Sequence, residues 1–192
     1  MRRPRSRRAL LASLLPVTAG LTGCSDSQLP ESDEPLESGV VPVDAYDCTD
    51  TERPRPATPP VDDALEPASY PDPSEPLLDD VDQFVRDFEA TYRRNAFIEA
   101  FGTETRAFDF RFGTRRTDEV ESESDRDAAL VSMVYHLETE TATGGERPEW
   151  ATRVTYYVDE NIVLRARYDG IANGPEFEPD PRSAGEPVAC FD

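Results

Sequence analysis

Residues 80–101, DVDQFVRDFEATYRRNAFIEAF, carry the most regular pattern in the chain. Apolar side chains recur three and four positions apart, which places them on one face of an α-helix: Val81, Phe84, Val85, Phe88, Tyr92, Ala96 and Phe97. The charged side chains lie toward water or at the edge of that face: Asp82, Arg86, Asp87, Glu89 and Arg93. Asp80 and Gln83 have the spacing of a capping box, and Gly102 suits a left-handed stop. The pattern predicts an amphipathic helix over residues 80–101.

After this helix the apolar period changes from 3.6 to 2, which is the period of β-strands. Four segments show it, each with one apolar face: Phe108, Phe110 and Phe112; Val131, Met133, Tyr135 and Leu137; Trp150, Thr152, Val154, Tyr156 and Val158; Ile162, Leu164, Ala166 and Tyr168. Residues 143–146 and 159–161 have the composition of hairpin turns, and the acidic residues 118–127 that of a longer connection. The two hairpin-length links predict that neighbouring strands run antiparallel, as a meander.

The fold class follows from these elements. We predict one α+β domain over residues 70–192, in which the amphipathic helix packs on a four-stranded antiparallel meander sheet. Its outline is similar to the cystatin fold or the nuclear-transport-factor fold. The proline-rich residues 173–192 predict an irregular tail.

The segment before the domain is rich in proline and acidic residues. Residues 24–69 have too few apolar side chains to offset the entropy of ordering, which predicts a disordered, extended tether. Residues 40–48 are more apolar, and they are a candidate segment for docking against the domain.

The first 23 residues have the composition of an export signal. Five arginines precede residues 9–21, an apolar run that contains Pro16 and is too short for a membrane-spanning helix of about 20 residues. Arg7 and Arg8 directly before that run resemble a twin-arginine signal, the alternative being an ordinary basic head. The run ends in a set that resembles a lipobox, the alternative being a chance run of small residues: Leu21, Thr22, Gly23 and the lipid-accepting Cys24.

The cysteine count agrees with a lipid on Cys24. The chain has three cysteines, so lipidation of Cys24 leaves Cys48 and Cys190 as an even pair. An oxidising compartment allows these two to form a disulfide that ties the ends of the domain together. Two free thiols are the alternative.

The charge of the chain limits its partners. The formal charge is −20, every basic residue is arginine, and loss of five arginines with residues 1–23 lowers the charge to −25. So acidic a surface excludes nucleic acid as a default partner. Acidic excess, lack of lysine, paired arginines and lipobox together resemble secreted lipoproteins of halophilic archaea, and residues 70–95 resemble a segment of such proteins. The resemblance implies anchoring to the cell membrane, on its external face, through a lipid on Cys24, and it implies no particular activity.

Few residues suggest chemistry. Four helix residues are candidates for the edge of a pocket between helix and sheet, the alternative being a polar network along the helix: Glu89, Tyr92, Arg93 and Asn95. The single histidine, His136, falls on the less apolar strand face and suits a surface role better than a general base. The acidic residues 118–127 lack the spacing of an EF-hand and suit a solvated loop. The sequence predicts no catalytic set, metal site or cofactor.

The leading expectation is therefore a non-enzymatic, lipid-anchored envelope protein that faces outward and binds a small ligand or another envelope protein. A small enzyme with an acidic pocket between helix and sheet is the first alternative. A purely structural surface component is the second.

Overall fold

The computed structural model describes residues 39–49, 51–121 and 126–191, all within one compact unit, Glu34–Asp192. The predicted export signal and lipobox lie outside the described residues: Arg7, Arg8, Leu21, Thr22, Gly23 and Cys24. Regular elements follow in the order α1 (Val81–Phe101), β1 (Thr105–Glu119), β2 (Ala128–Thr141), β3 (Gly145–Asp159), β4 (Ile162–Arg167), α2 (Pro181–Ala184) and β5 (Glu186–Cys190). Short 3₁₀ turns cover Val43–Ala45, Leu77–Asp79 and Gly102–Glu104.

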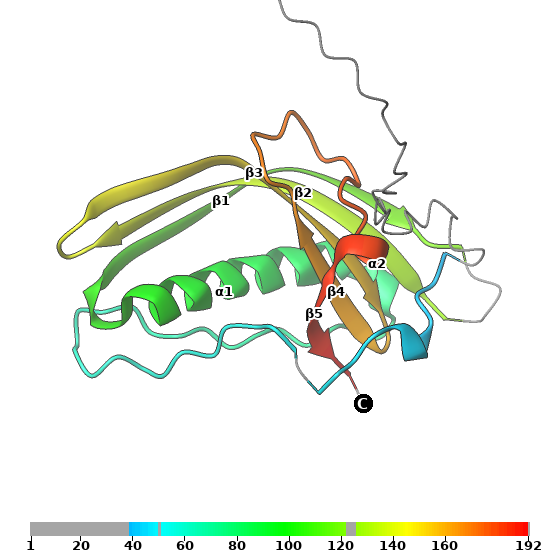
Figure 1. Cartoon of the computed structure of the whole chain (residues 1–192), viewed down its shortest axis with the longest axis horizontal. Helices are drawn as coiled ribbons and strands as arrows, with labels where there is room; N and C mark the ends of the chain where they lie inside the picture. The colour runs from blue at the N-terminus through cyan, green and yellow to red at the C-terminus, as the bar shows by residue number, and fades with distance from the viewer. Residues whose placement is uncertain (1–38, 50, 122–125, 192) are drawn as a thin grey trace, which may run out of the picture. The chain divides into compact units, whose positions relative to one another are not determined.

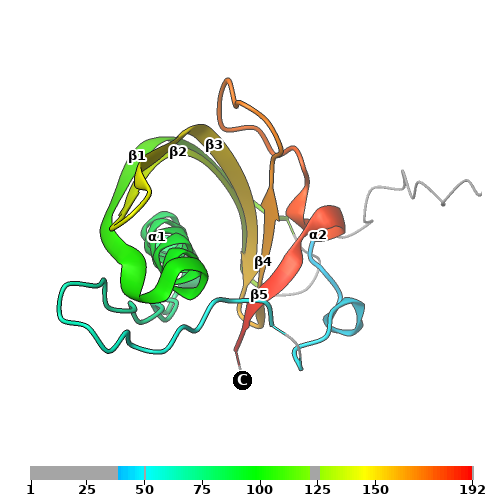
Figure 2. The same cartoon turned by 60° about the vertical axis from the view of Figure 1, so that its left-hand side comes forward.

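The strands form one antiparallel sheet in sequence order, and it curves around α1 (Figures 1 and 2). The α+β class, the single long helix and the antiparallel meander are thus confirmed. The sheet has five strands rather than four, because the tail is not irregular throughout. Its last residues pair with the free edge of β4, where Cys190 faces Ile162 and Ala189 faces Val163. Pro187 lies within this edge strand opposite Leu164, next to a register shift, a position where a sheet tolerates a proline.

The ends of α1 differ in how well the sequence predicted them. Asp80 makes no side-chain hydrogen bond to the first turn, and Gln83 bonds to Asp87 at 2.8 Å instead, so the predicted capping box does not form. At the other end Gly102 has a φ of 50° and donates its N–H to the carbonyl of Ile98. Gly102 thus ends the helix with a positive φ, as predicted, but its ψ of −120° lies outside the left-handed helical region.

The main core lies between α1 and the concave face of the sheet. The helix contributes Phe84, Val85 and Phe88, and the middle strands contribute the apolar faces expected of them: Val131, Met133, Tyr135, Leu137, Val154, Tyr156 and Val158. Strand β4 differs from expectation. Val163 enters the main core opposite Val158, so Ile162 and Leu164 point to the other face of the sheet.

A second, smaller apolar cluster covers that other face. It joins Ile162 and Leu164 with residues of three other segments: Val40, Val41, Ala128, Leu130 and Tyr157. Val40 and Val41 are almost fully buried there, which places the candidate docking segment against the sheet. Cys48 and Cys190 form the disulfide that the cysteine count predicts, with an S–S distance of 1.97 Å.

Residues 51–76, of which 51–69 were assigned to a tether by composition, run extended along the side of α1 that faces away from the sheet (Figures 1 and 2). Asn95 ties this segment to the helix because it bonds to both backbone groups of Ala68, each at 2.9 Å. Leu65 donates its N–H to Thr105 Oγ1 at 3.1 Å. Specific hydrogen bonds therefore order a stretch whose composition alone indicates disorder. Within the described ranges, no helix combines the length and the apolar character needed to cross a membrane.

Candidate functional site

A buried ion pair connects the helix to the sheet. Glu89, on α1, is fully buried, and both of its carboxylate oxygens have two hydrogen-bond donors. Arg165, on β4, donates from Nε to Oε2 at 2.8 Å and from Nη2 to Oε1 at 2.9 Å. The hydroxyl of Tyr135 donates to Oε1 at 2.7 Å, and that of Tyr156 donates to Oε2 at 2.5 Å. These four residues, here called the Glu89 cluster, join α1 to three neighbouring strands.

Electrostatics keep this carboxylate ionised. Burial alone would raise the pKa of Glu89, but the charge and hydrogen bonds of Arg165 outweigh burial and lower the pKa below its ordinary value of 4.5. Burial first, and the Glu89 charge second, raise the pKa values of Tyr135 and Tyr156 well above 10. The hydroxyls therefore stay protonated and act as donors. A carboxylate with all its donors in place and no contact with solvent links the elements that it joins and offers no free base.

The four predicted pocket residues have separate roles. Glu89 belongs to the buried cluster, the ring of Tyr92 lies 4.3 Å from the Arg165 guanidinium, and Asn95 holds Ala68. Of the four, Arg93 lines the pocket described next. The structure thus does not bring the four together at one site.

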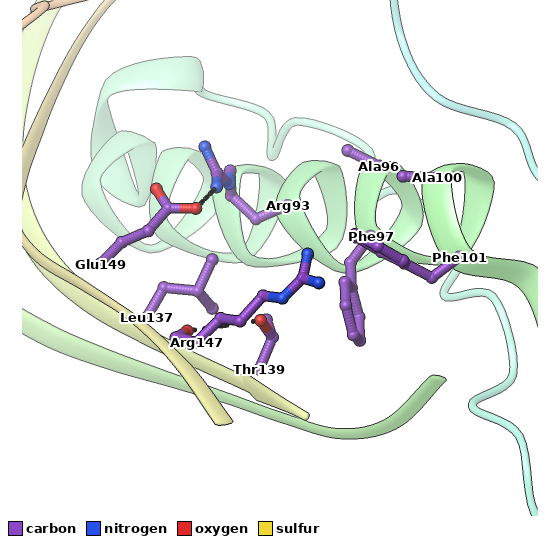
Figure 3. A pocket seen from close by; sticks show the side chains of 9 residues that line it. All are labelled: Arg93, Ala96, Phe97, Ala100, Phe101, Leu137, Thr139, Arg147 and Glu149. Carbon is purple, nitrogen blue, oxygen red and sulfur yellow. Dashed lines mark hydrogen bonds and ion pairs between the residues drawn. The ribbon is translucent and has the colours of Figure 1, made fainter. Parts of the chain in front are cut away.

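The pocket lies between the C-terminal half of α1 and the hairpin of β2 and β3 (Figure 3). Its volume is about 300 Å³, and its lining combines an apolar floor with a few polar groups: Arg93, Ala96, Phe97, Ala100, Phe101, Leu137, Thr139, Arg147 and Glu149. This combination is typical of sites for small ligands, and the volume is at the lower end of their range. We refer to it as the hairpin pocket.

Regular spacing builds the walls of the hairpin pocket. Arg93, Phe97 and Phe101 are four residues apart on α1 and share one face, while Ala96 and Ala100 leave space beside them. On the sheet, Leu137 faces Glu149 and Thr139 faces Arg147 across β2 and β3, so both pairs point to the same side.

A β-bulge directs Glu149 into the hairpin pocket. The register shifts between Tyr135 and Leu137, so that Trp150 and Ala151 together oppose His136. Ala151 has a φ of 50° and donates its N–H to His136 Nδ1 at 3.1 Å. The extra residue reverses the alternation: Trp150, expected on the apolar face, is 59% exposed.

Charge inside the hairpin pocket is unevenly paired. Glu149 bridges two arginines, with Oε1 2.5 Å from Arg93 and Oε2 3.1 Å from Arg167. Arg147 has no carboxylate partner within the described ranges, and its guanidinium lies 4.9 Å from the ring of Phe101 instead. The lining thus holds two arginines and one glutamate, a local excess of positive charge in a chain of formal charge −20.

Sequence reasoning missed most of the hairpin pocket. The spacing of Arg93, Phe97 and Phe101 was a usable signal for its helical side. Arg147 and Glu149 carried no such signal, because their position depends on the bulge and on a contact between residues 56 positions apart.

The other sequence candidates lie elsewhere. The half-buried His136 accepts the bond from Ala151, and its ring centroid is 5.4 Å from that of Trp150. Of the acidic connection, residues 122–125 are outside the described part of the chain. Among the residues that are described, no three histidine, cysteine or acidic side chains are arranged to hold a metal ion.

With this geometry established, comparison with known proteins adds no relative. Neither the family models nor the curated proteins nor the solved structures match this chain, so its function has to be inferred from its own residues.

Proposed function

We propose that this protein is a lipid-anchored binding module on the external face of the cell membrane, held by a lipid on Cys24. The observation that carries the proposal is the pairing of Cys48 with Cys190, which leaves Cys24 as the only other cysteine of the chain. That cysteine stands directly after Leu21, Thr22 and Gly23, where a lipobox places the modified thiol. A disulfide also suits a compartment outside the cytoplasm.

The binding role is supported by the contrast between the two polar sites. Glu89, the acid that an enzyme between helix and sheet would use, is buried and fully hydrogen-bonded. The hairpin pocket has an apolar floor and charged groups at its edge, and Arg147 is exposed there. We therefore favour a small ligand as the partner. We also propose that the outline of the fold, a curved sheet around one helix, is of the cystatin or nuclear-transport-factor type.

The anchor would hold the domain close to the membrane. The described unit begins at Gly39, 15 residues after Cys24. A fully extended chain of that length spans at most about 50 Å, which would be the largest distance between the anchored Cys24 and Gly39.

Mass spectrometry of the membrane-bound protein from native cells tests this proposal. We expect the mature chain to begin at Cys24 and to carry a lipid mass there. Cys24→Ser should release the protein from the membrane fraction, whereas the neighbouring Ser25→Ala should leave it there. Arg7→Lys combined with Arg8→Lys should retain the precursor inside the cell. A membrane-bound chain with an intact signal, or with an unmodified Cys24, would contradict the anchor.

A further inference from the structure

The hairpin pocket has features that select a class of ligand. Phe97 and Leu137 are buried, 7% and 2% exposed, and with Ala96 they provide an apolar floor. Arg147 projects across this floor from the rim (Figure 3). A ligand that fills the site must match both an apolar surface and a positive charge.

The protein already holds a carboxylate in this place. The side chain of Arg93 is 13% exposed, and its guanidinium binds Glu149 Oε1 at 2.5 Å. The Nε of Arg93 is buried and has no hydrogen-bond partner, so Glu149 does not satisfy this guanidinium fully. The planar fork of arginine matches the geometry of a carboxylate, the group that Arg93 already binds here.

From these contacts we infer that the hairpin pocket binds a small organic carboxylate with an apolar body, of the size of a phenylalkanoate. The carboxylate pairs with Arg147 at the rim, and the apolar body lies on Phe97 and Leu137. The inference rests on the proposed function only in treating the protein as a binding module. It adds the ligand class and the residues that select it.

Charge complementarity gives two opposite expectations. Removal of the Arg147 charge should weaken binding of the anion by about fivefold, the upper range for a partly exposed charge pair. Removal of the Glu149 charge should strengthen binding, because Glu149 repels the ligand and competes for Arg93. A site that recognised only apolar surface would respond to neither change.

The test uses the whole mature chain, residues 24–192, with Cys24→Ser so that neither lipid nor detergent competes for the pocket. The probe is 4-phenylbutyrate, and its neutral amide and acetate are the comparison ligands. Binding is followed by calorimetry and by amide chemical shifts at about 0.1 M salt, where an exposed charge pair is screened less than in molar salt. We expect 4-phenylbutyrate to shift the signals of Phe97, Leu137 and Thr139, to bind about fivefold more tightly than its amide, and to bind at least about tenfold more tightly than acetate, which is about 1.4 kcal/mol.

Four variants complete the test. Arg147→Gln should weaken 4-phenylbutyrate binding, Glu149→Gln should strengthen it, and Arg111→Gln should have no effect because its ion pairs with Asp109 and Glu138 lie on exposed β1 and β2 positions outside the lining. Circular dichroism confirms that each variant is folded. Filling the pocket through Ala96→Leu should abolish binding with all charges kept.

Two binding results would overturn the inference: equal affinity for the acid and the amide, or an unchanged affinity in Arg147→Gln. Two spectral results would also overturn it: chemical-shift changes confined to other residues, or no change at about 10 mM ligand, a concentration well above a Kd of about 1 mM. The two proposals fail separately. A lipidated, membrane-bound protein that binds no carboxylate keeps its anchor and loses this ligand. An unlipidated protein that binds 4-phenylbutyrate keeps the site and loses the anchor.

Discussion

Arg165 holds the buried carboxylate of Glu89 with two parallel hydrogen bonds, one from Nε and one from Nη2, across 76 residues of sequence. The pair joins the middle of α1 to β4, on the inner side of the curved sheet. Because burial removes both charges from water, each is tolerated only while the other is present.

Replacement of Arg165 tests this dependence. Arg165→Met leaves the Glu89 carboxylate buried without its cation, and we expect it to lower the free energy of unfolding by about 3–5 kcal/mol. The double variant Glu89→Leu with Arg165→Met should recover part of that loss, because no uncompensated charge remains. Recovery should be incomplete, since Tyr135 and Tyr156 both lose their acceptor. Urea unfolding followed by circular dichroism measures these values.

The matched control is Arg111→Met, which removes an exposed arginine with two carboxylate partners. Its unfolding midpoint should stay that of the unchanged protein. A double variant less stable than Arg165→Met alone would contradict this account of the pair.

The lowered pKa of Glu89 predicts a pH dependence. Since the folded-state pKa lies below the ordinary value of 4.5, the ionised carboxylate stabilises the protein above that value. This contribution is lost as the pH falls through the folded-state pKa. The stability difference between the unchanged protein and Glu89→Gln should therefore be constant near neutral pH and shrink below 4.5.

Comparison with Glu89→Gln is needed because protonation of the many other acidic groups also changes stability, and does so equally in both proteins. Urea unfolding from neutral pH to about pH 3 measures the difference. A difference that stays constant or grows in acid would show that Glu89 is not the group responsible.

The helix and the first four strands were predictable because their signals are local. The apolar periods of 3.6 and 2 within residues 80–101 and 105–167 depend only on near neighbours. Strand β5 was missed because its pairing partner β4 lies about 25 residues earlier and the prolines between them indicate a loop. The ordered run along α1 was missed for the same reason, since Asn95 and Ala68 are 27 residues apart.

The polar sites were harder to predict than the fold. Glu89 follows Phe88 at the edge of the apolar face, and only contact with the distant Arg165 explains why it is buried rather than solvated. Trp150 was placed on the wrong face because strict alternation does not allow for an extra residue. The bulge itself had no glycine to indicate it, as Ala151 takes the positive φ.

That bulge provides another prediction. A left-handed conformation costs a residue with a Cβ about 1–2 kcal/mol, and a β-branched residue more. Ala151→Gly should therefore be at least as stable as the unchanged protein, whereas Ala151→Val should be less stable. Trp150, the only tryptophan, lies beside His136 with the two rings tilted by 59°, so its fluorescence reports directly on the bulge.

Ala107→Val is the control for adding a β-branched side chain to an exposed strand position, and it should be neutral. Unfolding in urea with tryptophan fluorescence as the probe compares the three variants. Equal stability of Ala151→Gly and Ala151→Val would mean that residue 151 does not hold a left-handed conformation in solution.

The disulfide closes a long loop and should contribute strongly to stability. Cys48 and Cys190 are 142 residues apart, a separation for which loop entropy predicts about 5 kcal/mol. Replacing both with serine should lower the thermal midpoint, and a reducing agent should lower that of the unchanged protein to a similar value. The same agent should not change the thermal midpoint of the serine variant. It should lower the thermal midpoint of Cys24→Ser, because that variant retains the bridge.

The bridge should also have a local effect. Directly after Cys48, Glu52 donates its N–H to Pro187 at 2.9 Å, and beyond Cys190, Phe191 donates to Asn161 at 2.9 Å. If the disulfide holds these contacts, exchange of both amides with solvent should accelerate on reduction more than that of Val85 in the middle of α1. Uniform acceleration would instead mean that the bridge acts only through the unfolded chain, as the loop-entropy argument alone requires.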